Sequence, residues 1–170
     1  DSYDAMVSFT VDEPRVRVIR FRRNFGQTAA MSAGFDHARG DVIIPIDADL
    51  QNDPEDIGRL LERIDEGYDV ASGWRVRRRD SMLSVTLPSR VGNWIIGGVT
   101  GVKLHDYGCT LTAYRREIVQ SFRLYGEMHR FLPAWAASVG ASICEVEVNH
   151  HPRKWGTSKY SVAKAWRVLL

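Results

Sequence analysis

Apolar and polar residues alternate in blocks that predict strands and helices in turn through the first half of the chain. Residues 15–21 alternate with the period of a half-buried strand, and residues 41–46 and 69–73 are short apolar runs typical of buried strands. Residues 27–38 predict a small-residue helix, and residues 57–64 carry the apolar stripe of a core-facing helix. This βαβαβ order predicts parallel strands with ligands at their carboxyl ends.

The second half of the chain is less regular but continues the same mixture of elements. Residues 89–100 and 129–139 predict helices, residues 109–114 and 143–149 predict strands, and residues 161–170 begin an amphipathic helix. No repeat, low-complexity segment or linker divides the sequence. We therefore expect one α/β domain spanning residues 1–170, with helices on both faces of a mostly parallel sheet.

Composition narrows the class of protein. A chain of 170 residues that is 44% hydrophobic is long enough for one domain with its own core. The net charge of +2 does not indicate a nucleic-acid binder. The two cysteines, Cys109 and Cys144, lack the spacing of a zinc site and fit a reducing compartment. No signal peptide and no apolar run of membrane-spanning length is present in this sequence.

The two ends of the sequence suggest part of a longer protein. The chain begins in a polar helical stretch without a preceding strand, and it stops as the apolar helix at 161–170 develops. We expect a domain truncated at its N-terminus, with residues 161–170 starting an interfacial or membrane-leading helix. An exposed sheet edge in such a piece would favour homo-oligomers.

The stretch Asp47-Ala48-Asp49-Leu50-Gln51 is the strongest candidate for chemistry. It follows a buried strand directly, and residues i and i+2 of an extended chain point the same way, so Asp47 and Asp49 can reach one ion. Oxygen ligands suit Mg²⁺ or Mn²⁺, which commonly bridge to phosphates. The alternative is a strand-to-helix turn in which Asp49 or Asp53 caps the next helix.

Three other stretches contain side chains that suit phosphates or an acceptor. Arg75 and its neighbouring arginines follow the third strand, at the same predicted edge as Asp47. Asp106 lies in a tight turn, where it either orients an acceptor or simply forms the turn. Residues 150–160 combine cations, hydroxyls and a glycine, which suits a loop closing over phosphates or lying on a membrane surface.

Taken together, these stretches resemble glycosyltransferase family 2, and within it the polyprenyl-phosphate glycosyltransferases. The resemblance rests on RNFGQ, DADLQ with DPE, DYGC and GTSKY, at residues 23–27, 47–51, 53–55, 106–109 and 156–160. It implies the GT-A fold, a Rossmann-like α/β sheet. It also implies an inverting, metal-dependent transfer of a hexose from a nucleotide diphosphate sugar, UDP- or GDP-linked, to a polyprenyl phosphate (undecaprenyl or dolichyl).

The resemblance also assigns roles to individual residues. Mg²⁺ or Mn²⁺ would be held by Asp47 and Asp49 with help from Gln51. Arg75 would neutralise the departing diphosphate, and Asp106 would act near the acceptor as a base or as an orienting group. The remaining residues would contact phosphates of the donor or the lipid: Arg90, Arg153, Ser158 and Lys159.

The sequence departs from the family pattern at both ends. The family's first two strands, which hold the nucleotide base and ribose, have no counterpart here, and neither do its C-terminal membrane helices. We therefore expect the isolated chain to be soluble and weakly active, and the full-length protein to act at the cytoplasmic face of the membrane.

Three other functions remain open from the sequence. The acceptor of a family 2 transferase can be a saccharide instead of a lipid. The chain can be a non-catalytic interaction module, although such a module has no need of a metal–diphosphate set. A metal-dependent nucleotidyltransferase also uses paired aspartates, but the loop ending in Ser158-Lys159-Tyr160 argues against it.

Overall fold

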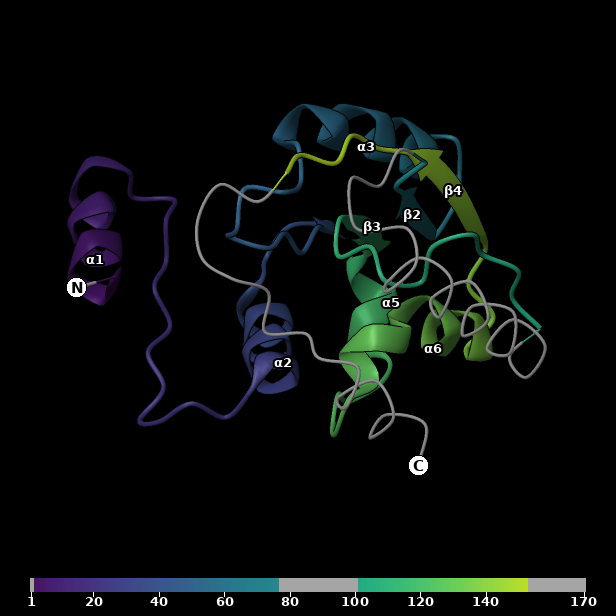
Figure 1. Ribbon diagram of the computed structural model, residues 1–170. Helices are drawn as coiled ribbons and strands as arrows, with labels where there is room; N and C mark the ends of the chain where they lie inside the picture. Colours follow the sequence, from purple (N-terminus) through teal and green to yellow (C-terminus); the bar gives the residue numbers. More distant parts are fainter. Residues whose placement is uncertain (1, 77–100, 153–170) are drawn as a thin grey trace.

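The computed structural model describes residues 2–76 and 101–152, which form a four-stranded sheet with helices on both faces (Figure 1). The elements in chain order are α1 (Ser2–Asp12), α2 (Gln27–His37), β1 (Val42–Ile43), η1 (Pro54–Asp56), α3 (Ile57–Asp65), β2 (Val70–Trp74), β3 (Thr112–Arg115), α5 (Arg116–Gln120), η3 (Met128–Phe131), α6 (Leu132–Ser138) and β4 (Ile143–Glu147). The helices predicted at 89–100 and 161–170 lie outside the described residues.

The sheet has the strand order β1-β3-β2-β4. Strand β3 runs antiparallel to both of its neighbours, whereas β2 and β4 are parallel. Consequently β1, β2 and β4 all run in the same direction. Strand β3 runs the opposite way, so it begins at the end of the sheet where the other three strands finish. The predicted α/β class is confirmed, with one antiparallel strand inserted between the first two parallel ones.

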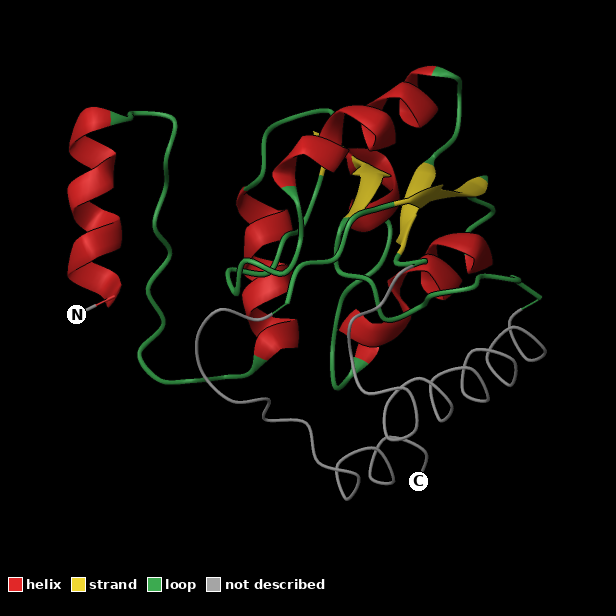
Figure 2. Cartoon of the chain, turned by 45° about the horizontal axis from the view of Figure 1, so that its top comes forward, coloured by secondary structure: helices red, strands yellow, loops and turns green. Residues whose placement is uncertain are grey.

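Alternation along the strands divides the core into two layers. Ala71 and Ala113 face α3, where Leu60 and Ile64 pack on them. The layer on the opposite face is made by residues from the sheet, α2, α5 and α6: Phe35, Ile43, Val70, Tyr114, Val119, Leu132 and Ala136. Figure 2 shows these helices on opposite sides of the strands. The rigid sheet thus has both faces covered, and its edges and loops are left for chemistry.

Three of the predicted strands and one predicted helix are corrected by the structure. Residues 15–21 form no strand, because no described segment pairs with them; their alternation alone does not supply the ladder hydrogen bonds. The strand predicted at 41–46 pairs only over Val42–Ile43. The strand predicted at 109–114 begins later, at Thr112, and the helix predicted at 129–139 is split into η3 and α6.

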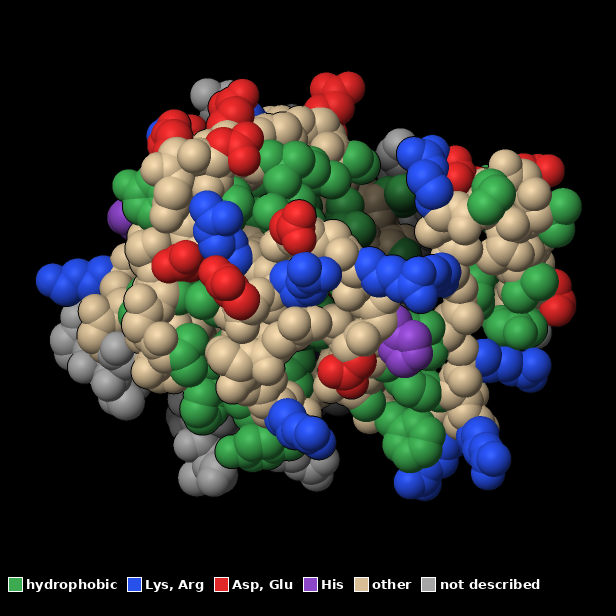
Figure 3. Space-filling view, turned by 180° about the vertical axis from the view of Figure 1, so that it is seen from behind, with side chains coloured by type: hydrophobic (Ala, Val, Ile, Leu, Met, Phe, Trp, Pro, Cys, Tyr) green, Lys and Arg blue, Asp and Glu red, His purple; other side chains and the backbone are tan. Residues whose placement is uncertain are grey.

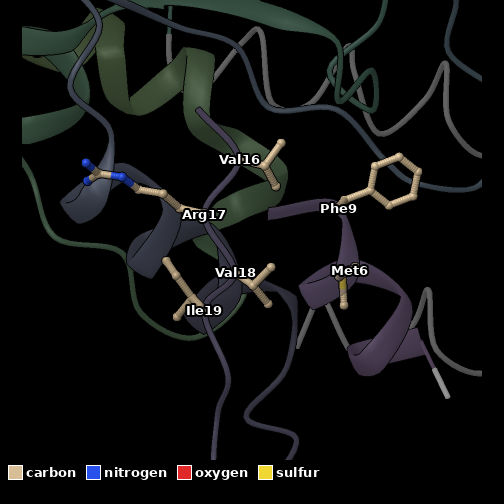
Figure 4. A pocket seen from close by; sticks show the side chains of 6 residues that line it. All are labelled: Met6, Phe9, Val16, Arg17, Val18 and Ile19. Atoms are coloured by element: carbon tan, nitrogen blue, oxygen red, sulfur yellow. The ribbon is translucent and has the colours of Figure 1, made fainter. Parts of the chain in front are cut away.

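Helix α1 stands apart from the sheet and its covering helices (Figures 1 and 2). None of its residues is buried, and the guanidinium of Arg20 lies 4.4 Å from the ring centre of Tyr3. An apolar groove between α1 and the following segment is lined in part by Met6, Phe9 and Ile19 (Figure 4). Seen from behind, α1 lies beside the main body with hydrophobic side chains on its surface (Figure 3). No helix of the described residues combines the length and apolar character needed to span a membrane.

Candidate active site

The candidate residues lie at the end of the sheet where β1, β2 and β4 finish. Asp47 follows β1, and Arg75 follows β2 directly. Residues 105–111 lead into β3, which runs the opposite way and therefore starts at this same edge. The chain that leaves β4 passes here too, through Asn149. These segments therefore meet at the carboxyl ends of the parallel strands, where the strand order predicts a ligand site.

Asp47 is held in place by two side chains from different elements. Thr110 Oγ1 donates a 2.6 Å hydrogen bond to Asp47 Oδ2, and Gln27 Nε2 donates a 3.4 Å hydrogen bond to Asp47 Oδ1. Gln27 is the first residue of α2 and the last residue of the RNFGQ stretch at residues 23–27. Hydrogen bonds of this kind fix the orientation of a carboxylate without neutralising its charge.

Asp49 lies in a tight turn of its own. Its Oδ1 accepts a 3.2 Å hydrogen bond from the backbone N–H of Gln51, and Leu50 between them adopts a φ of 62°. A left-handed conformation is uncommon for a residue other than glycine, which marks this turn as one to examine for function. The turn keeps Asp49 half-buried at the same loop as Asp47.

Asp53 caps the helix that follows this loop. The sequence predicts such a cap, by Asp49 or Asp53, as the alternative to a metal site. Asp53 Oδ1 accepts a 3.0 Å hydrogen bond from the backbone N–H of Glu55, and Pro54 occupies the first position of η1. The cap role therefore falls to Asp53 and leaves Asp49 out of the helix start.

The donor set fits a divalent cation of the oxygen-preferring kind. The loop offers the carboxylates of Asp47 and Asp49, and the described residues contain no group of three or more His, Cys, Asp or Glu that would form a cage. Mg²⁺ is commonly bound through one or two carboxylates and completes its shell with water and substrate phosphates. The side chain of Gln51, predicted to assist, donates from Nε2 to the carbonyl of His151 at 3.4 Å.

The loop is tied to the segment after β4 by several contacts. The backbone N–H of His151 donates to the carbonyl of Gln51 at 2.9 Å, and His151 Nε2 lies 3.0 Å from Asp53 Oδ2. The hydrogen bond from His151 is the largest cause that holds the pKa of Asp53 below its usual value. These contacts place the start of the basic segment 150–160 against the acidic loop.

A buried aspartate reinforces that junction. Asp56 is 1% exposed. Its Oδ2 accepts a 2.5 Å hydrogen bond from the backbone N–H of Asn149, and its Oδ1 accepts a 3.0 Å hydrogen bond from Asn149 Nδ2. Arg59 forms an ion pair with the same carboxylate. Sequence reasoning missed Asp56 and Asn149. No motif or spacing marks either residue, and only the fold brings them together.

Arg75 and Asp106 form a buried ion pair. Asp106 Oδ2 accepts from Arg75 Nε at 2.7 Å and Asp106 Oδ1 accepts from Arg75 Nη2 at 2.9 Å, with side-chain exposures of 12% for Arg75 and 5% for Asp106. Asp106 Oδ1 also accepts from the backbone N–H of Gly108 at 3.1 Å. The sequence placed these two residues in separate roles, and their pairing was not predicted.

This pairing bears on the two roles predicted for Asp106. A general base needs a lone pair that faces the proton it removes, whereas both oxygens of Asp106 accept hydrogen bonds from the protein. The geometry favours a role in orienting Arg75 and the turn. The predicted phosphate-binding residues Arg90, Arg153, Ser158 and Lys159 lie outside the described residues.

The fold and the loop that carries Asp47 and Asp49 are those of a glycosyltransferase-like α/β domain. Comparison of the sequence with protein-family models identifies the family. Residues 1–123 match the family model described as Glycosyl transferase family 2. The match covers more than half of the chain, and the chain therefore belongs to this family.

Relatives with assigned activities carry the names of polyprenyl-phosphate sugar transferases. A dodecaprenyl-phosphate galacturonate synthase of Rhizobium johnstonii is 49% identical over 158 residues, which covers 91% of this chain and 47% of that protein. An undecaprenyl-phosphate 4-deoxy-4-formamido-L-arabinose transferase of Pseudomonas aeruginosa is 45% identical over 158 residues, covering 93% and 46%. The subgroup predicted from the motifs is confirmed, and the chain spans about half the length of these curated relatives.

Solved structures share the fold at low sequence identity. Glucosyl-3-phosphoglycerate synthase from Mycobacterium tuberculosis in complex with uridine diphosphate superimposes with a TM-score of 0.61 at 16% identity, covering 94% of this chain and 56% of that one. The same enzyme with Mn²⁺ and uridine-diphosphate-glucose gives a TM-score of 0.60 at 16% identity, covering 94% and 56%. This likeness concerns the fold, and it confirms the predicted GT-A architecture.

Proposed function

We propose that the full-length protein is a glycosyltransferase that moves a hexose from a nucleotide diphosphate sugar to a polyprenyl phosphate, with inversion at the anomeric carbon. The observation that supports this most is the meeting of the acidic loop (Asp47, Asp49) and the Arg75–Asp106 pair at one sheet edge. Relatives named as dodecaprenyl- and undecaprenyl-phosphate transferases support the lipid acceptor. We further propose that it acts at the cytoplasmic face of the membrane.

The donor half of the site would act by charge stabilisation. Asp47 and Asp49 would hold Mg²⁺ or Mn²⁺, which supplies positive charge to the diphosphate when bound. Glucosyl-3-phosphoglycerate synthase, which shares this fold, was crystallised with Mn²⁺ and uridine-diphosphate-glucose and with Mg²⁺ and uridine diphosphate, which supports the same assignment here. Thr110 and Gln27 would keep Asp47 pointed at the ion, and Gln51 would hold the loop against the segment at His151.

Arg75 would stabilise the negative charge that develops on the leaving nucleoside diphosphate. Its guanidinium is planar, and Asp106 fixes its orientation through two hydrogen bonds, so it would meet the diphosphate with little reorganisation. Arg90, Arg153, Ser158 and Lys159 would contact the remaining phosphates of donor and acceptor.

The acceptor needs little activation in this reaction. A lipid phosphate is already anionic near neutral pH, and its oxygen would attack the anomeric carbon from the face opposite the departing diphosphate. No proton has to be removed for that step. This agrees with the geometry of Asp106, whose oxygens are engaged by Arg75 and Gly108.

The decisive experiment is a donor and acceptor panel with the full-length protein in membranes. UDP- and GDP-hexoses are offered with undecaprenyl phosphate, dolichyl phosphate and soluble glycans, and products are identified by mass. We expect a lipid-linked monosaccharide whose formation requires Mg²⁺ or Mn²⁺. Sugar incorporated into glycans and not into lipid would replace the lipid acceptor with a saccharide, and no transfer to any acceptor would favour a non-catalytic module.

A further inference from the structure

Glu145 on β4 accepts hydrogen bonds from the start of the loop that carries Asp106, the ion-pair partner of Arg75. Glu145 Oε1 accepts from the backbone N–H of His105 at 2.8 Å and from that of Asp106 at 3.4 Å. Glu145 Oε2 lies 2.7 Å from His105 Nδ1. One carboxylate therefore receives three donors from two consecutive residues, a chelating arrangement that leaves little freedom to the backbone of this turn.

The His105 side chain is 66% exposed, but two features constrain this contact. The Glu145 side chain is only 14% exposed, so its charge is poorly solvated and depends on these donors. The imidazole of His105 is also stacked on the indole of Trp74, with ring centres 4.3 Å apart and planes 17° apart. His105 is thus held from β4 by Glu145 and from β2 by Trp74.

The contacts continue from the turn to the catalytic candidate. Trp74 is the last residue of β2 and precedes Arg75, while His105 precedes Asp106. Both residues of the Arg75–Asp106 pair are therefore anchored through the neighbour that precedes them in the chain. Displacement of the His105–Asp106 backbone would carry the Asp106 carboxylate away from Arg75 Nε and Nη2.

We propose that Glu145 is a positioning residue that sets the orientation of the Arg75 guanidinium through His105 and Asp106. This inference rests on the proposed function for its catalytic consequence, because Arg75 acts on the leaving diphosphate there. Its structural part stands independently. Glu145 touches neither donor nor acceptor; it fixes the turn from which Arg75 is aimed, and misplacement of a catalytic group by about 1 Å can lower a rate by about a hundredfold.

The first test reads Arg75 directly and needs no activity. In the full-length protein, the side-chain Nε–H of Arg75 is followed by nitrogen-15 NMR, with assignment by Arg75→Lys. We expect Glu145→Ala to shift this signal and to accelerate its exchange with solvent. Glu147→Ala is the matched control, because Glu147 lies two residues further along β4 and is exposed. An unchanged Arg75 signal in a folded Glu145→Ala protein would overturn the proposal.

The second test is a double-mutant cycle on transfer activity. We expect Glu145→Ala to lower kcat about tenfold or more with little change in the KM for lipid phosphate, and to have no further effect when Arg75→Ala is already present. Additive losses would show that Glu145 acts independently of Arg75 and would overturn the proposal. If Glu145→Ala fails to fold, Glu145→Gln replaces it, since the amide oxygen still accepts from the backbone while the charge facing His105 is lost.

The two tests separate the possible failures. Absence of transfer by the unaltered protein would remove the proposed function. The NMR signal of Arg75 would still show whether Glu145 sets the orientation of its guanidinium. Normal transfer with an Arg75 signal insensitive to Glu145 would remove the inference alone.

Discussion

Thr110 Oγ1 donates a 2.6 Å hydrogen bond to Asp47 Oδ2 across 63 residues of sequence. The contact exists because β1 pairs with β3 in the register Ile43↔Tyr114, so the loop that leaves β1 meets the loop that enters β3. The hydroxyl thereby orients one of the two carboxylates proposed to hold the cation.

Thr110→Val should weaken metal binding without preventing folding. The substitution keeps the branched shape and removes the donor to Asp47, and loss of such an outer partner typically costs 10–100-fold in metal affinity or activity. We expect the Mn²⁺ concentration for half-maximal activity to rise about tenfold. Thr110→Ser, which keeps a hydroxyl, is the control and should stay near the unaltered value. If Thr110→Val and Thr110→Ser required the same Mn²⁺ concentration for half-maximal activity, the hydroxyl of Thr110 would have no role in metal binding.

Asp47→Asn and Asp49→Asn should each lower kcat/KM by about a hundredfold or more, because the cation and the charge it brings to the diphosphate are lost. Asp65→Asn in α3 is a matched control on an exposed carboxylate. Activity is measured with the full-length protein, and circular dichroism melting checks that all three fold alike. Unimpaired transfer by Asp47→Asn would contradict the metal site.

The sequence predicted the parts of this site that depend on local pattern. The Asp53-Pro54 cap and the apolar stripe of α3 are set by neighbouring residues, and the structure contains both of them. The predicted buried strand before Asp47 is only partly present, because Ile43 alone is buried in it. The strand order β1-β3-β2-β4 was beyond such reasoning, because insertion of β3 is decided by pairing between distant segments.

The contacts that organise the site were equally out of reach. Arg75 and Asp106 were each singled out, but nothing in their spacing of 31 residues predicts a bidentate pair. Asp56 reads as an ordinary residue of a helix start, and only the fold reveals that it is buried against Asn149. Side chains that act through tertiary contacts carry no period or motif of their own.

Asp106→Asn should destabilise the protein and leave the shape of the pH–rate profile unchanged. Removal of one partner from a buried ion pair leaves the other charge uncompensated, which costs about 3 kcal/mol in unfolding free energy. Asp41→Asn is the contrasting variant, because Asp41 pairs with Arg116 at 96% side-chain exposure, and it should cost less than about 1 kcal/mol. Loss of a basic limb from the profile, with stability intact, would instead establish Asp106 as the general base.

Gly73→Ala should be among the most damaging single-methyl changes in the part of the chain that the structure describes. A Cβ at Gly73 would lie 2.4 Å from the carbonyl oxygen of Leu111 and 2.9 Å from Cys109 Sγ, just beyond the last residue pair of β2 and β3. Relief requires the strands to move apart, and we expect about 3 kcal/mol or more of lost stability in urea unfolding. Gly58→Ala in α3 meets nothing within 4 Å and should raise stability by about 0.5–1 kcal/mol.

Cys144 should react slowly with alkylating reagents and should become reactive only at raised pH. Burial raises the pKa of its thiol, against a smaller opposing effect of Arg63. The thiolate is the nucleophile, so at pH 8 the folded protein should be alkylated more slowly than the same peptide in concentrated urea, as followed by mass spectrometry.

The same shift fixes the sign of a stability effect. Because the unfolded thiol ionises first, near pH 8.5, the unfolded state loses its proton while the folded state keeps it. The contribution of Cys144 to stability is therefore complete below this pH and declines as the pH rises towards the folded pKa. Urea unfolding at pH 7 and pH 9.5 should show this decline, and Cys144→Ala should reduce it. A decline of equal size in Cys144→Ala would assign the pH dependence to other groups.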